Sequence, residues 1–97
     1  MATIYLVETK TFLIGCDGCE YQLADMGTLP FLFTSMNAAA KQMEMCRKVH
    51  TEIFNETIVK DYQPSEITDE ECYDRFETRH NITKSRTIVS LYKRHTL

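Results

Sequence analysis

The chain has 97 residues, a formal net charge of −3 at neutral pH and 43% apolar residues. This length fits one small domain, and the apolar content argues against a disordered chain. The sequence has no apolar run of the roughly 18 residues that a membrane-spanning helix requires, and no secretion signal. We therefore expect one cytoplasmic domain over residues 1–97, and the net charge disfavours a globally basic nucleic-acid-binding protein.

The first part of the chain predicts three strands. Ala2 to Ile14 is rich in β-branched and aromatic residues and is predicted to form the first strand. The Asp17-Gly18 pair is a hairpin signal because both central positions of such a turn favour positive φ, so Glu20 to Ala24 is predicted to return beside it. After a turn at Asp25-Met26-Gly27, Pro30 to Phe33 is predicted to form a short strand at a sheet edge or start.

A long helix is predicted over Met36 to Phe54. Ser35 or Thr34 can cap its first turn, because a hydroxyl oxygen there accepts a hydrogen bond from an unpaired backbone amide. Apolar residues recur at three- and four-residue steps and define the face expected to meet the core. These residues are Ala39, Met43, Cys46, Val49 and Ile53.

The rest of the chain predicts a strand at Thr57 to Tyr62, a second helix at Asp69 to His80 and a last strand at Ser85 to Arg94. The second helix is predicted from a capping box, in which Thr68 and Glu71 each satisfy an amide of the first turn. Together these elements predict an α+β fold, an antiparallel sheet of three to five strands packed by two helices.

The cysteines leave two interpretations open. Cys16 and Cys19 on the hairpin, together with Cys46 and His50 on the first helix, have the ligand types of a structural zinc site. Alternatively Cys46 and Cys72 are small core residues, while the other two cysteines flank a turn. We favour the second interpretation and expect no cofactor or metal.

No catalytic motif is evident in the sequence. Cys46 and His50 lie one helical turn apart, but the sequence indicates neither an orienting carboxylate nor an oxyanion hole. The three glycines are dispersed, so there is no glycine-rich phosphate loop. We therefore predict that the protein is not an enzyme.

Charge is distributed unevenly along the second half of the chain. Residues 61–77 contain seven acids and one base, whereas residues 78–97 contain five bases and no acid. On a helix, Glu66, Glu70, Asp74 and Glu77 would share one face, about 5–6 Å apart. Glu66 precedes the predicted cap at Thr68, so it joins this row only if the helix begins earlier. The spacing within this row is comparable to the distance between successive phosphates of a nucleic-acid strand. Such a row of carboxylates could therefore occupy a basic groove that normally binds nucleic acid.

The chain resembles the small acidic inhibitors encoded by phages, in particular the anti-CRISPR proteins that act on type I-F surveillance complexes. The resemblance rests on the size, the α+β layout, the lack of catalytic motifs and the acidic row Glu66, Glu70, Asp74 and Glu77. It implies a stoichiometric inhibitor in the bacterial cytoplasm. Some members mimic DNA and block the groove where the target duplex enters.

We therefore predict a monomeric protein that binds a CRISPR surveillance complex through an acidic face and blocks target DNA binding, without binding nucleic acid or membrane itself. Tyrosines near the acids would anchor the interface. The predicted partner-binding residues are Glu66, Asp69, Glu70, Asp74, Glu77, Tyr62 and Tyr73. The alternative is a small interaction module, zinc-stabilised or metal-free, that binds nucleic acid through the basic end from Lys84 to Arg94.

Overall fold

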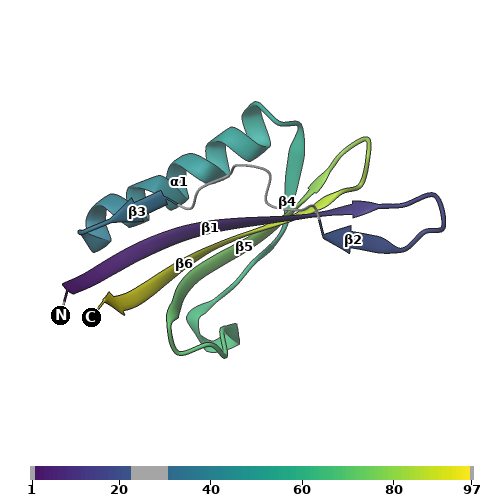
Figure 1. Ribbon diagram of the computed structural model, residues 1–97. Helices are drawn as coiled ribbons and strands as arrows, with labels where there is room; N and C mark the ends of the chain where they lie inside the picture. The colour runs from purple at the N-terminus through teal and green to yellow at the C-terminus, as the bar shows by residue number, and fades with distance from the viewer. Residues whose placement is uncertain (1, 23–30, 97) are drawn as a thin grey trace.

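A computed structural model describes residues 2–22 and 31–96. In this part of the chain, six strands form one antiparallel sheet and one α-helix lies along one of its faces (Figure 1). The strands are β1 (Ala2–Ile14), β2 (Glu20–Gln22), β3 (Phe31–Phe33), β4 (Glu56–Asp61), β5 (Cys72–His80) and β6 (Arg86–Thr96). The helix α1 spans Met36–Glu52, and a short 3-10 helix, η1, spans Pro64–Glu66.

The long strands β1 and β6 form the centre of the sheet. The strand order is β2-β1-β6-β5-β4, and β3 also pairs with β1. β1 and β6 stay in register from Ala2 opposite Thr96 to Phe12 opposite Arg86. The two ends of the described chain therefore lie side by side, as Figure 1 shows.

The mixed α+β class is confirmed, but two parts of the prediction are wrong: the described chain has one α-helix instead of two, and its sheet has six strands instead of three to five. Residues 72–80 form β5, paired with β4 on one side and β6 on the other. The buried side chains of Phe76 and Thr78 alternate with half-buried neighbours, which is the period of a strand. The expected capping box does not form, because the Asp69 carboxylate accepts a hydrogen bond from the Glu71 amide and closes a local turn instead.

The predicted first helix is confirmed, but it ends earlier than expected. The Ser35 hydroxyl accepts a hydrogen bond from the Ala38 amide at 3.4 Å, so Ser35 is the cap. The helix ends at Glu52 rather than Phe54, and Ile53 is 70% exposed instead of facing the core. His50, which was not part of the predicted apolar face, is buried near the end of the helix.

The β1–β2 hairpin is also confirmed, with a longer loop than expected. The Gly15 amide donates to the Cys19 carbonyl at 2.8 Å, and of the Asp17-Gly18 pair Gly18 alone has a positive φ, of 81°. β2 ends at Gln22, and the predicted turn at 25–27 lies outside the described residues, as do Ala24 and Pro30 of the predicted strands.

The hydrophobic core lies between α1 and the sheet. It contains Val7, Ala39, Met43, Cys46, Phe76, Val89 and Leu91. Alternate residues of β1, β5 and β6 point into this core, while the residues between them point to the other face of the sheet, which no helix of the described chain covers. We call this second surface the open face. Within residues 2–22 and 31–96, no helix is long and apolar enough to cross a membrane.

Candidate binding surface

The predicted acidic row does not exist as a row, because its members do not share a helix. Glu66 lies in η1, Glu70 in the turn before β5, and Asp74 and Glu77 on β5. Two residues three apart on a strand point to opposite faces of the sheet. Accordingly, Asp74 lies on the α1 side, where it pairs with Arg47, while Glu77 lies on the open face beside Arg86.

Asp74 belongs to an ion-pair cluster that connects the helix to the sheet. Arg47 of α1 donates from Nη2 to Asp61 at 2.9 Å and to Asp74 at 3.0 Å, and its guanidinium lies 4.8 Å from the centre of the Phe76 ring. Burial opposes the charge of Arg47, but the hydrogen bonds to Asp61 and Asp74 outweigh it and raise the pKa of the guanidinium. The Asp74 carboxylate is thus engaged within the molecule.

Two other predicted acids are also paired internally. Glu77 accepts from Arg86 at 3.1 Å, and Arg86 also contacts Glu20 at 2.9 Å. Glu66 lies 3.2 Å from Lys60, and the Gln63 amide and Lys60 lower the pKa of the Glu66 carboxyl. These pairs reduce the negative charge that this surface offers to another molecule.

The remaining predicted partner-binding residues lie around the turn before β5. Asp69, Glu70 and Tyr73 are exposed, and Tyr73 is 48% exposed. Tyr62 is half-buried, with the Lys60 ammonium 4.5 Å and the Arg75 guanidinium 5.8 Å from its ring centre. Three of these residues are therefore exposed within a five-residue stretch of the chain, whereas Tyr62 lies beside two cations.

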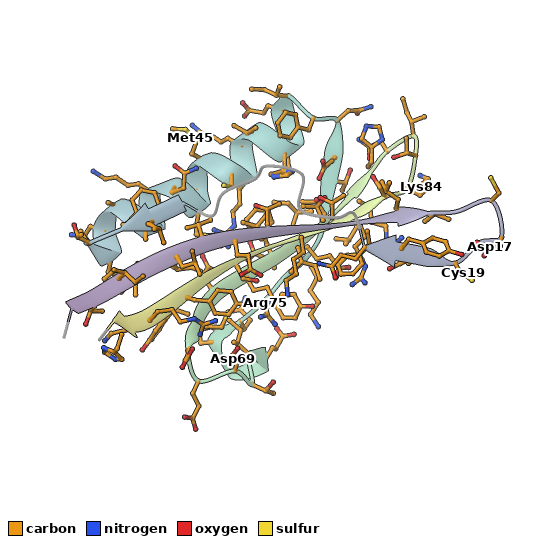
Figure 2. The ribbon with its side chains drawn as sticks, viewed as in Figure 1. Asp17, Cys19, Met45, Asp69, Arg75 and Lys84 are labelled. Carbon is orange, nitrogen blue, oxygen red and sulfur yellow. The ribbon has the colours of Figure 1, made fainter. Side chains whose placement is uncertain are left out.

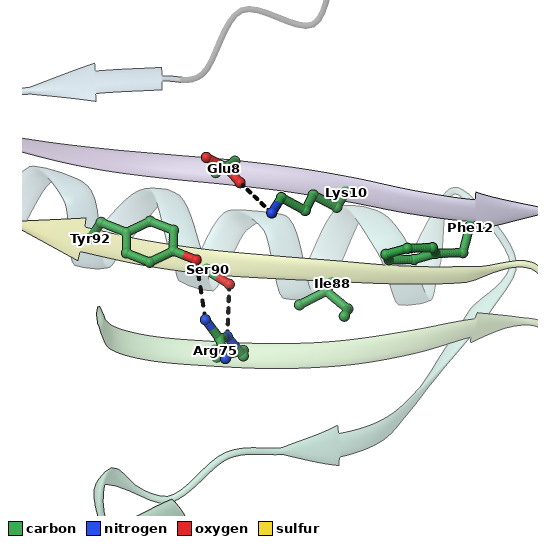
Figure 3. Close-up of a pocket in the computed structure, with 7 residues that line it drawn as sticks. All are labelled: Glu8, Lys10, Phe12, Arg75, Ile88, Ser90 and Tyr92. Carbon is green, nitrogen blue, oxygen red and sulfur yellow. Dashed lines mark hydrogen bonds and ion pairs between the residues drawn. The ribbon is translucent and has the colours of Figure 1, made fainter. Parts of the chain in front are cut away.

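A basic group that the sequence analysis passed over stands at the centre of the open face. Arg75 of β5 donates from Nε to the Ser90 hydroxyl at 3.0 Å and from Nη2 to the Tyr92 hydroxyl at 3.1 Å (Figure 3). Both acceptors lie on the neighbouring strand β6 and are themselves buried. The guanidinium is therefore held in one orientation by two uncharged groups.

Arg75 is also distinguished by its lack of a counter-charge in the described part of the chain. The other four arginines each pair with at least one carboxylate. Glu8, which lies directly across β6 from Arg75 in the register, pairs with Lys10 at 3.4 Å. Among the described residues of the open face, the Arg75 guanidinium is thus the cation best placed to accept an external anion.

Arg75 lines a shallow depression of about 210 Å³. Its lining residues are Glu8, Lys10, Phe12, Arg75, Ile88, Ser90 and Tyr92. Phe12 and Ile88 lie together at one end of the depression, as Figure 3 shows, and the Arg86 guanidinium lies 4.5 Å from the Phe12 ring centre. The depression therefore combines one unpaired cation with an apolar surface. We refer to it as the Arg75 depression.

The alternation of β5 would have revealed Arg75, had that segment been recognised as a strand. On a strand, Arg75 and Glu77 share a face opposite to Phe76. In the sequence analysis, Arg75 was the single base among the seven acids of residues 61–77 and was given no role of its own. Its hydroxyl partners on β6 depend on the pairing of two strands, which no local pattern indicates.

The structure does not assemble the zinc ligands considered above. Cys19 and its neighbour Asp17 lie at the tip of the β1–β2 hairpin, away from the helix that carries Cys46 and His50 (Figure 2). Across residues 2–22 and 31–96, no three His, Cys, Asp or Glu side chains are grouped closely enough to hold a metal. Burial raises the pKa of the Cys46 thiol, which disfavours the thiolate that nucleophilic catalysis requires.

The chain was compared with protein-family models, with curated proteins and with solved structures, and none of the three comparisons gave a match.

Proposed function

We propose that the protein is a non-catalytic binding protein whose open face docks a segment of a partner protein that presents a carboxylate to Arg75. The observation that supports this proposal is the unpaired, half-buried guanidinium at the centre of the open face. A carboxylate is the protein group that matches a guanidinium in charge and in bidentate geometry. Because Ser90 and Tyr92 already fix the arginine, binding requires little further ordering of its side chain.

The apolar surroundings favour a protein segment over a small free anion. Phe12 and Ile88 line the depression. Leu32 of β3, opposite Leu6 in the register and therefore on the same face, is 62% exposed. A partner segment with apolar residues next to its carboxylate would cover these side chains, and such burial is a main source of affinity in protein interfaces.

The charges around the depression favour a carboxylate over the phosphates of nucleic acid. Glu8 lines the depression and Glu77 lies two residues along β5 from Arg75, on the same face. The neighbouring cations Lys10 and Arg86 are already paired with acids. One free positive charge among acids complements a single carboxylate, whereas a phosphate chain needs several cations in succession.

The test is a titration of the isotope-labelled protein, followed by NMR, with acetyl-Leu-Glu-Leu-amide and with its Gln counterpart. We expect shifts at Phe12, Ile88 and Ser90 and about tenfold weaker binding of the Gln peptide, because a charge-assisted hydrogen bond is lost. Arg75→Gln should abolish this preference. Lys48→Gln, which removes an exposed charge on α1, should preserve it.

Two outcomes would overturn the proposal. Equal binding of the Glu and Gln peptides would show that Arg75 does not read a carboxylate. A single-stranded oligonucleotide that shifts the same residues while the Glu peptide does not would favour the nucleic-acid-binding alternative, in which Arg86 and Arg94 of β6 contact phosphates. Such binding would weaken as salt rises.

Inhibition of a CRISPR surveillance complex through acidic residues is our second proposal. It is favoured by the exposure of Asp69 and Glu70 in the segment before β5 and of Tyr73 at the start of β5. A double variant, Asp69→Lys with Glu70→Lys, should weaken inhibition of target DNA binding by a purified type I-F complex, and Glu52→Lys at the exposed end of α1 is the matched control. Inhibition that equals the parent's would remove this proposal.

A further inference from the structure

A second cavity lies between α1 and the sheet, on the side opposite to the Arg75 depression. We propose that this cavity binds a small, uncharged, mostly apolar molecule that carries one hydroxyl group. The cavity has a volume of about 490 Å³, within the range of about 300–1,000 Å³ typical of small-molecule sites. This inference is independent of the proposed function, because no residue lines both sites.

The helix supplies an apolar wall. Met45, Val49 and Phe54 line the cavity from α1 and the residues just after it. Met45 is 59% exposed and Phe54 is 49% exposed, which are high values for side chains of this size. Figure 2 shows Met45 on the helix at the outer surface. A bound apolar molecule would remove part of this surface from water, which favours binding.

The sheet supplies a wall of hydroxyl groups. Thr9 and Thr11 of β1 and Thr87 of β6 line the cavity from below the helix. The hydroxyls of Thr11 and Thr87 lie 3.3 Å apart, close enough for one to donate weakly to the other. These threonines offer methyl groups for packing and hydroxyl oxygens for hydrogen bonds, and they carry no net charge.

The lining of the cavity includes a mostly buried polar pair, His50 and Glu56. His50 Nδ1 lies 3.0 Å from Glu56 Oε1, and the Thr78 hydroxyl donates to the same carboxylate oxygen. The side chains of His50 and Glu56 are each 11% exposed. Because an ionised carboxylate only accepts hydrogen bonds, Nδ1 carries the hydrogen. In the neutral imidazole, Nε2 is then an acceptor for a ligand hydroxyl.

The charges of the lining select against ionised ligands. No lysine or arginine is among the described residues that line this cavity, so an anion would lose its hydration without gaining a counter-charge from them. The Glu56 carboxylate already accepts from His50 and Thr78, which leaves it less able to compensate a buried ammonium. A neutral molecule with one hydroxyl avoids both costs.

The test uses four probes of similar size: 2-phenylethanol, ethylbenzene, phenylacetate and 2-phenylethylamine. Binding is followed by NMR shifts of the labelled protein. The alcohol should shift Thr9, Val49 and His50 and bind about fivefold tighter than ethylbenzene, as one hydrogen bond predicts. Phenylacetate and the amine should bind more weakly than the alcohol. Failure of the alcohol to shift the lining, or equal or tighter binding of any other probe, would overturn the proposal.

Variants that fill the cavity test whether the alcohol binds inside it. Thr9→Phe should abolish alcohol binding, whereas Thr3→Phe, on the same strand and the same face but not lining the cavity, should leave it unchanged. If the Thr9→Phe variant does not fold, Val49→Phe replaces it, because this substitution fills the cavity from the opposite wall. Unchanged binding by both cavity-filling variants would also overturn the proposal. In every variant, binding of the Glu peptide at Arg75 is measured as well, because it shows separately whether the open face is intact.

Discussion

The ion-pair cluster around Arg47 gives the sharpest test of the architecture. Arg47→Met removes the charge and keeps most of the aliphatic stem, so the change isolates the ionic contacts. The substitution leaves the carboxylates of Asp61 and Asp74 without their guanidinium partner. It also removes the cation that lies 4.8 Å from the Phe76 ring centre.

The expected loss follows from the burial of the partners. The Arg47 side chain is 17% exposed, that of Asp74 30% and that of Asp61 50%. Exposed ion pairs contribute about 0–1 kcal/mol and breaking a buried one costs about 3–5 kcal/mol. For a half-buried cluster we expect a loss of about 2 kcal/mol in the free energy of unfolding. In a domain of this size, that loss corresponds to a decrease in Tm of about 8–16 °C.

Urea denaturation followed by circular dichroism measures this loss. Arg79→Met is the matched control, because Arg79 is 40% exposed and its contact with Glu20 is 3.7 Å long. The control should lose less than about 0.5 kcal/mol. An Arg47→Met variant as stable as the control would refute the reasoning, since it would mean that Asp61 and Asp74 need no internal partner. It would also return Asp74 to the acids available for a partner.

Four further predictions concern the core, the cysteines and the hairpin. Phe76 is fully buried, so Phe76→Ala should lose about 3–5 kcal/mol in urea denaturation; a loss below about 1 kcal/mol would contradict the packing described. Iodoacetamide should modify the exposed Cys16 and Cys19 rapidly and the buried Cys46 and Cys72 only on unfolding, as read by mass spectrometry. Burial raises the pKa of the Cys46 and Cys72 thiols above the ordinary 9.0, so the unfolded chain loses these protons at a lower pH than the folded protein does. The free energy of unfolding should therefore fall as pH rises above 9.0. A free energy of unfolding that rises in this range would contradict the burial of the thiols. Gly18→Ala should cost about 1 kcal/mol because φ is positive there, and Gly18→Asn should cost less; equal losses would argue against this backbone conformation.

The elements predicted correctly are those whose signals are local. α1 has a hydroxyl cap at Ser35 and an apolar stripe through Ala39, Met43 and Cys46, and the structure buries all three. The β-branched residues of β1 likewise predicted a strand over the same bounds that the structure shows. In these segments, local preference and tertiary packing agree, so the sequence alone was sufficient.

β5 was mistaken for a helix because local and long-range preferences conflict there. Thr68 and Glu71 imitate a capping box, and the acids that follow Thr68 suit the first turn of a helix. Pairing with two strands overrides these signals and places Phe76 opposite Val89 in the core. Glu71, which was expected to cap the helix, pairs with Arg94 of β6 instead. The acidic row was a consequence of this error.

The position of Arg75 beside a central strand explains how a single guanidinium can be held ready for a ligand. Ser90 and Tyr92 alternate along β6 with Val89 and Leu91, which are buried in the core on the other face. A shift of β6 that moved the two hydroxyls would also disturb this core and the pairing with β1 and β5. The core packing therefore restrains the acceptors of Arg75. A cation on a loop would lack that restraint and would lose more side-chain freedom on binding.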